Sequence, residues 1–154
     1  MHDVRLPIIA KIADALNKAE VRWAIGGSTL LFLKGIDFEF NDLDIVVLEE
    51  DAQKAKEALL SIGAAYHKSE KAPTTKVFEE FTVDGLDVDV ISGFIIQAYG
   101  KEFDCSFKNE NVEEIEVEGV KVRLDSLEAW QNIYQLQDRQ EKAHYITDYL
   151  RYHK

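Results

Sequence analysis

The segment DLDIVV, at residues 42–47, places two carboxylates inside a run that otherwise has the pattern of a buried strand. Because side chains alternate between the faces of a strand, Asp42 and Asp44 share one face and the intervening apolar residues share the other. A charge is costly to remove from water, and two carboxylates on one face repel each other. Either this is the solvated face of an edge strand, or a hard divalent cation binds between the carboxylates. Val46 and Leu48 continue the same face as apolar residues, which favours the metal site.

A second carboxylate pair occurs in the segment LDVDVIS, at residues 86–92. Asp87 and Asp89 again share one face of a predicted strand. A third carboxylate on a neighbouring strand would complete a two-metal site, in which the ions hold the attacking and leaving oxygens of a phosphoryl or nucleotidyl displacement. Alternation alone leaves open whether Asp87 or Asp89 supplies that carboxylate.

The segment Gly26-Gly27-Ser28 follows a predicted strand and precedes a predicted helix. Glycines at such a turn let the backbone approach a phosphate closely. The N-terminus of a helix also offers unpaired N–H groups to an anion. The Ser28 hydroxyl is a further donor, so the segment predicts a phosphate-binding turn.

Hydrophobic periodicity and start and stop signals predict helices at residues about 5–19, 28–34, 52–62 and 140 to the end. The same signals predict strands at about 21–25 and 43–48 and two β-hairpins with acidic-Gly turns at 84–85 and 118–119. Asp125 to Glu128 resembles a capping box that opens another helix. Residues about 64–76 are polar and contain Pro73, which predicts a flexible loop.

This interleaving of helices and strands predicts an α/β (α+β) fold. The length of 154 residues suits one domain, residues 1–154, with a core at about 20–125 and C-terminal helices at about 126–153. The net charge of −11 argues against long duplex nucleic acid as a partner. No apolar run reaches the roughly 20 residues that span a bilayer, and the N-terminus lacks the pattern of a signal peptide. Since Cys105 is the only cysteine, we expect a reducing, cytoplasmic setting.

The Gly-Gly-Ser turn, a spacer of thirteen residues, the Asp42-Leu43-Asp44 pair and a later strand Asp resemble the DNA polymerase β-like nucleotidyltransferase superfamily. The small members are the most similar, namely minimal, antibiotic and toxin-associated nucleotidyltransferases. The resemblance implies a nucleotidyltransferase fold, with a mixed β-sheet flanked by helices and a C-terminal helical tail. It also implies transfer of a nucleoside monophosphate from an NTP, with ATP expected, to a hydroxyl acceptor with release of pyrophosphate.

The same resemblance implies roles for individual residues. Gly26, Gly27 and Ser28 would hold the nucleotide phosphates, and Asp42 and Asp44 would bind Mg²⁺ or Mn²⁺. The third carboxylate would bind metal and act as the base for the acceptor hydroxyl. Asp89 fits that role better than Asp87, because family members often have Asp followed by apolar residues, Ser and Gly, as at residues 89–93.

The C-terminal part of the chain departs from the family pattern. It keeps Arg139 and Lys142 as candidate nucleotide-binding residues. Five other residues differ from those that relatives carry. Tyr134 stands in place of a Lys, Asp138 of a Gly and Ala143 of an Asp, while Phe38 and Phe40 stand in place of an Arg and a Thr. The incomplete cationic set leaves an alternative function open, in which a degenerate, antitoxin-like member acts through a protein partner. A homo-oligomer is also compatible with the sequence.

Overall fold

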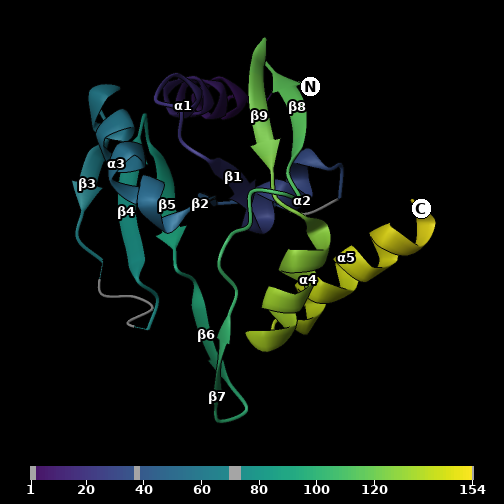
Figure 1. Cartoon of the computed structure of the whole chain (residues 1–154). Coiled ribbons are helices and arrows are strands. Elements are labelled where there is room, and N and C mark those ends of the chain that lie inside the picture. Colours follow the sequence, from purple (N-terminus) through teal and green to yellow (C-terminus); the bar gives the residue numbers. More distant parts are fainter. Residues whose placement is uncertain (1–2, 37–38, 70–73, 154) are drawn as a thin grey trace.

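The computed structural model describes residues 3–36, 39–69 and 74–153. In these ranges the chain forms a seven-stranded mixed sheet in the order β3-β4-β5-β2-β1-β9-β8 (Figure 1). Its strands are β1 (Trp23–Gly26), β2 (Asp42–Val47), β3 (Ala65–His67), β4 (Val77–Val83), β5 (Leu86–Ser92), β8 (Glu113–Val117) and β9 (Val120–Leu124). A separate two-stranded ribbon contains β6 (Ile95–Ala98) and β7 (Lys101–Asp104). The mixed α/β fold predicted from the sequence is confirmed.

Strand β2 lies in the interior of the sheet, antiparallel to β1 and parallel to β5. Its apolar positions are accordingly fully buried, and Leu43 and Ile45 have no exposed surface. A solvated edge-strand face is therefore the wrong interpretation of the carboxylate pair. The parallel register places Asp42 opposite Asp87 and Asp44 opposite Asp89.

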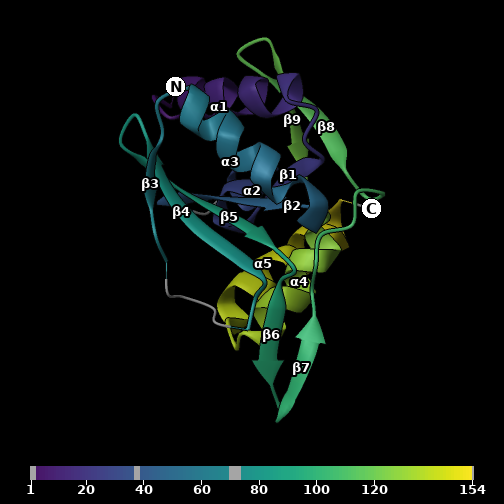
Figure 2. The same ribbon diagram turned by 60° about the vertical axis from the view of Figure 1, so that its left-hand side comes forward.

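The helices are α1 (Leu6–Lys18), α2 (Gly27–Leu33), α3 (Ala52–Ser61), α4 (Leu127–Leu136) and α5 (Gln140–Tyr152), with a short 3₁₀ turn, η1, at Glu49–Asp51. Helices α1 and α3 pack against each other and contact β9 and β5 respectively (Figure 2). Helix α2 contacts β1, β2 and α4, and α4 pairs with α5. None of the helices in the described ranges is long and apolar enough to cross a bilayer.

Both acidic-Gly turns form as predicted from the sequence. Asp84 and Gly85 have φ values of 51° and 86°, and Glu118 and Gly119 have 49° and 78°. Two consecutive positive φ values are the requirement of the tight hairpin turn that Asp-Gly-type pairs favour. These turns fix the β4–β5 and β8–β9 pairings, and the β4–β5 pairing sets which residues flank Asp89.

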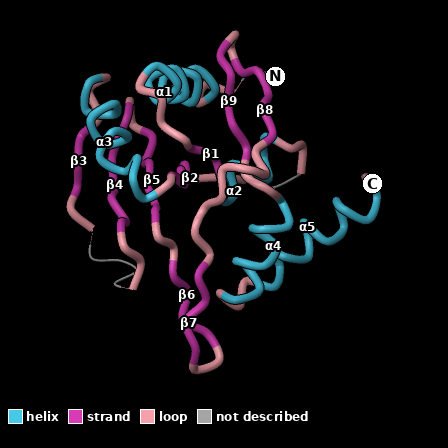
Figure 3. The backbone as a smooth tube through the Cα atoms, in the orientation of Figure 1, coloured by secondary structure: helices cyan, strands magenta, loops and turns pink. Residues whose placement is uncertain are grey.

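Three details differ from the sequence-based expectations (Figure 3). Residues 65–67 form edge strand β3 rather than loop, because they pair with β4; Pro73 lies outside the described residues. The β6–β7 ribbon was not anticipated. Helix α4 is capped by Ser126, whose hydroxyl accepts a hydrogen bond from the Ala129 N–H at 3.1 Å. The cap was predicted one residue earlier, at Asp125, but that carboxylate instead accepts the indole N–H of Trp130 at 3.0 Å.

Gly26 ends β1 where the ring of Trp130 packs on the backbone. Its φ of −119° is available to any residue, so the backbone conformation does not explain why a glycine is needed at this position. A Cβ atom at Gly26 would instead overlap the Trp130 indole, which is 3% exposed. The glycine therefore allows α4 to dock closely onto the sheet.

We predict that Gly26→Ala lowers the free energy of unfolding by about 1–3 kcal/mol through overpacking. The measurement is urea denaturation of the single variants and of the double variant with Trp130→Leu. In the Trp130→Leu background the cost of Gly26→Ala should shrink strongly, because the overlapping ring is absent. An unchanged cost in that background would show that the strain lies elsewhere.

Candidate active site

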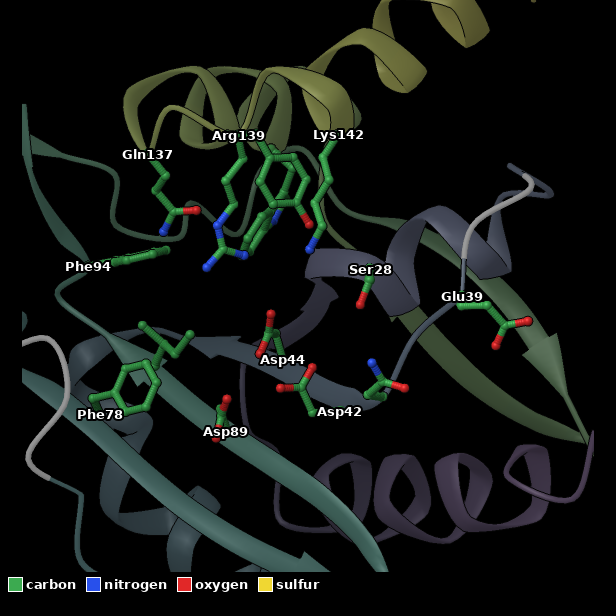
Figure 4. Close-up of a pocket in the computed structure, with 14 residues that line it drawn as sticks. Ser28, Glu39, Asp42, Asp44, Phe78, Asp89, Phe94, Gln137, Arg139 and Lys142 are labelled. Carbon is green, nitrogen blue, oxygen red and sulfur yellow. The ribbon is translucent and has the colours of Figure 1, made fainter.

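Three carboxylates meet on adjacent strands in the interior of the sheet. Asp42 and Asp44 come from β2 and Asp89 from β5, and one oxygen atom of each lies within 4.8 Å of the others. All three point toward α4 and α5, on the opposite face of the sheet from α1 (Figure 4). Asp87 is exposed and receives a 3.4 Å hydrogen bond from the Thr82 hydroxyl. The structure thus brings Asp89, and not Asp87, together with the β2 pair.

Asp44 is the central carboxylate of this group. Burial raises its pKa from the ordinary 3.8 to about 7, and the neighbouring charges of Asp42 and Asp89 act in the same direction. The positive charge of Lys142 opposes this shift. A carboxylate held under such repulsion is stabilised when a cation binds beside it. The group has the donor chemistry of a hard divalent metal site, with carboxylate oxygens as ligands.

Gly27 and Ser28 begin helix α2 beside Asp44. Gly27 has a φ of 65°, a left-handed conformation that a residue with a Cβ adopts only with strain. A Cβ atom there would also overlap the Asp44 carboxylate. The hydroxyl of Ser28 lines the same pocket and lies across from the Asp42 carboxylate (Figure 4). Gly26 and Gly27 thus shape the site by leaving room for Trp130 and Asp44.

Asp42 is positioned through its backbone and the residues just before it. The Thr29 hydroxyl of α2 donates a hydrogen bond to the Asp42 carbonyl at 2.8 Å. The Arg5 guanidinium donates to the Phe40 carbonyl and lies 3.6 Å from the centroid of the Phe40 ring. It also forms an ion pair with Asp3 at 2.7 Å. The fully buried Phe40 therefore anchors the start of β2. Phe38, the other phenylalanine that departs from the family pattern, lies outside the described residues.

The turn between α4 and α5 brings two cations over the carboxylates. Asp138 has a φ of 59°, so this aspartate adopts the left-handed conformation that a glycine would take without strain. The turn is closed by a 2.7 Å hydrogen bond from the Arg139 N–H to the Tyr134 carbonyl. Arg139 and Lys142 then project toward the carboxylate group (Figure 4).

Tyr134 is 2% exposed and lines the same pocket as these cations and the carboxylates. Burial and the charge of Asp44 raise the pKa of its phenol, so the side chain stays neutral. The ammonium of Lys142 lies 5.3 Å from the Tyr134 ring centroid, within range of a cation–π interaction. Lys142 therefore places a positive charge beside Tyr134.

The pocket enclosed by these groups has a volume of about 540 Å³. Beyond the residues expected from the sequence, it is lined by Glu39, Asn41, Phe78, Ile91, Phe94, Trp130 and Gln137. Strand alternation could have indicated Phe78 and Ile91 once their pairing was known, since they face each other across β4 and β5. Trp130 is both buried and part of the pocket wall.

The raised pKa of Asp44 predicts how stability depends on pH in metal-free protein. A carboxyl with a folded-state pKa above its unfolded value contributes stability below the unfolded pKa, and that contribution is lost as pH rises through the folded pKa. Relative to the wild type, Asp44→Asn should therefore be more stable at pH 8 by about 2–4 kcal/mol. The difference should shrink as pH falls and vanish below about pH 3, where Asp44 is protonated in both states. The measurement is urea denaturation of both proteins in the presence of a metal chelator. A lower free energy of unfolding for Asp44→Asn than for the wild type at pH 8 would contradict the prediction.

Comparisons with known proteins identify the family of the chain. The model of the aminoglycoside-2''-adenylyltransferase family matches residues 8–148, which include the three carboxylates and the α4–α5 turn. No curated protein sequence is significantly similar to the chain.

Solved structures of nucleotidyltransferases share the fold. The Thermotoga maritima protein TM1012, provisionally assigned as a nucleotidyltransferase, is 26% identical, with a TM-score of 0.70 over 97% of this chain and 96% of that one. ANT(2'')-Ia in complex with adenylyl-2''-tobramycin is 14% identical, with a TM-score of 0.66 over 96% and 90%. Lincomycin-bound LnuA is 17% identical, with a TM-score of 0.59 over 94% and 96%. From the family match over most of its length, the chain belongs to the aminoglycoside-2''-adenylyltransferase family of nucleotidyltransferase enzymes.

Proposed function

We propose that the protein transfers a nucleoside monophosphate from a Mg²⁺-bound NTP, with ATP the expected donor, to a hydroxyl acceptor and releases pyrophosphate. The observation that carries this proposal is the pairing of opposite charges across one pocket. One oxygen atom of each of three carboxylates lies within 4.8 Å of the others on the sheet. Arg139, in the α4–α5 turn, and Lys142, on α5, face them across the pocket. Family membership supports the nucleotidyl-transfer class of this reaction.

Asp42, Asp44 and Asp89 are the residues that would hold Mg²⁺ or Mn²⁺. Their fit is supported by their convergence and by the repulsion that a cation would relieve. When bound, such a metal neutralises charge on the phosphates and on the reacting oxygens. The missing Cβ of Gly27 leaves Asp44 free to keep its position on the sheet.

Ser28, Arg139 and Lys142 would hold the triphosphate. The Ser28 hydroxyl can donate to a phosphate oxygen from one wall of the pocket, and the two cations can do so from the other (Figure 4). Charge-assisted hydrogen bonds of this kind are the strong ones in anion binding. Gly26 and Gly27 belong to the same turn, where they shape the wall that carries Ser28.

In the proposed reaction Asp89 accepts the proton of the acceptor hydroxyl. The acceptor oxygen forms a bond to the α-phosphorus, the bond from that phosphorus to the bridging oxygen of the β-phosphate breaks, and pyrophosphate leaves. Arg139 and Lys142 then lie where they can balance the charge that develops on the leaving group. Two structural relatives hold antibiotics or an adenylylated antibiotic, and we propose a hydroxyl-bearing small molecule as the acceptor here.

The first test of this function is a thermal-shift titration with Mg²⁺ or Mn²⁺, alone and with ATP. Binding to the folded state alone raises the melting temperature by mass action. We expect Asp44→Asn and Asp89→Asn to remove the metal-dependent rise, while Asp87→Asn, the matched exposed control on the same strand, keeps it. If no combination of NTP and metal raised the melting temperature of the wild type, the result would favour the alternative function, in which the protein acts through a protein partner.

The second test concerns the cation on α5. Lys142→Met should weaken ATP binding about ten- to hundredfold in the presence of Mg²⁺, because a charge-assisted phosphate contact contributes about 1.5–3 kcal/mol. Arg151→Met, which removes an exposed cation from the far end of the same helix, is the control. Calorimetric titration would contradict the assignment if both variants bound ATP as tightly as the wild type.

A further inference from the structure

We propose that Phe78, Ile91 and Phe94 form an acceptor subsite beside Asp89, and that it binds a ring with an apolar face next to the reacting hydroxyl. This inference rests on the proposed function and adds the chemical class of the acceptor. It is carried by the strand register, by the direction of the reaction and by the apolar character of this end of the pocket.

The strand register places the apolar residues next to Asp89. Ile91 follows Asp89 by two residues on β5, so both side chains lie on the same face. Phe78 on β4 is the direct cross-strand partner of Ile91. Phe94 lies just beyond the end of β5 and lines the same pocket. Two elements therefore converge on one apolar wall at the Asp89 end of the site.

The direction of the reaction assigns this end to the acceptor. In an in-line displacement the attacking and leaving oxygens lie on opposite sides of the phosphorus. Ser28, proposed to hold the leaving phosphates, lies toward α2, whereas Phe78 and Phe94 lie at the other end with the carboxylates between (Figure 4). The acceptor must therefore approach from the end that these rings form.

The wall has the chemistry of a ring-binding surface. Ile91 and Phe94 are 4% and 7% exposed, and Phe78 is half-buried at the pocket edge. The Phe94 ring lies 6.2 Å, centroid to centroid, from the Trp130 ring, which lines the same pocket. An aromatic side chain can stack on a flat ring of a ligand, and such stacking buries a larger area than contact with an aliphatic chain. Glu80, the cross-strand neighbour of Asp89, receives a hydrogen bond from Ser69 and is outside the pocket lining.

The test uses two matched probes, phenyl β-D-glucopyranoside and methyl β-D-glucopyranoside, which carry the same hydroxyls and differ in one flat ring. Each is titrated by NMR into protein that holds Mg²⁺ and α,β-methylene ATP. We expect the phenyl glycoside to bind about fivefold or more tightly than the methyl glycoside in the wild type. Phe78→Ala should reduce this preference to within about twofold. Phe78→Leu, which keeps most of the buried volume, should do the same if the alanine variant is unstable.

Tyr99→Ala is the matched control, because it removes an 80% exposed aromatic ring outside the pocket and should keep the preference. Equal binding of the two glycosides to the wild type, with normal binding of the ATP analogue, overturns the subsite and leaves the proposed function standing. Failure of the analogue to bind with Mg²⁺ overturns the proposed function itself. Weaker analogue binding in Phe78→Ala, with the phenyl preference retained, would assign the ring to the nucleobase and overturn the inference.

Discussion

Mutual repulsion among three carboxylates is the constraint around which this structure is arranged. Asp42, Asp44 and Asp89 lie on neighbouring strands in the interior of the sheet, where water is partly excluded and their charges act strongly on one another. Such a group costs stability in the absence of a cation, and a fold tolerates that cost only when function requires it. The elements that surround the group hold it in place from several directions.

Those elements come from distant parts of the sequence. Arg5, before α1, and Thr29, on α2, fix the backbone of residues 40–42 through hydrogen bonds to carbonyl groups. Gly27 leaves space for the Asp44 carboxylate. The α4–α5 turn brings Lys142 near enough for its charge to oppose the rise in the pKa of Asp44. The same contacts that stabilise the carboxylates therefore define the pocket in which a nucleotide and an acceptor would meet.

Local patterns predicted much of this arrangement. Alternation in residues 42–47 placed two carboxylates on one face, and the two acidic-Gly pairs predicted hairpin turns that the structure contains. Helical periodicity located α1 and α5 to within one or two residues at the ends that lie in the described ranges. The three-residue strand β3 was missed because its residues are polar and exposed, and its pairing with β4 is what makes it a strand. The β6–β7 ribbon is a local hairpin and was missed because its turn residues, Tyr99 and Gly100, are not an Asn-Gly or Asp-Gly pair.

The sequence by itself determined the chemistry available to this protein: paired carboxylates on a strand, a Gly-Gly-Ser turn before a helix, and an acidic chain with a net charge of −11. Only the tertiary structure decided which groups meet. The parallel register of β2 and β5 placed Asp89 opposite Asp44, so that these two carboxylates converge with Asp42. The docking of α4 required Gly26, and the left-handed Asp138 directed Arg139 and Lys142 into the pocket. The physical reason is that alternation and periodicity act between near neighbours in the chain, whereas strand order, register and helix docking are set by burial of surfaces that lie far apart in sequence.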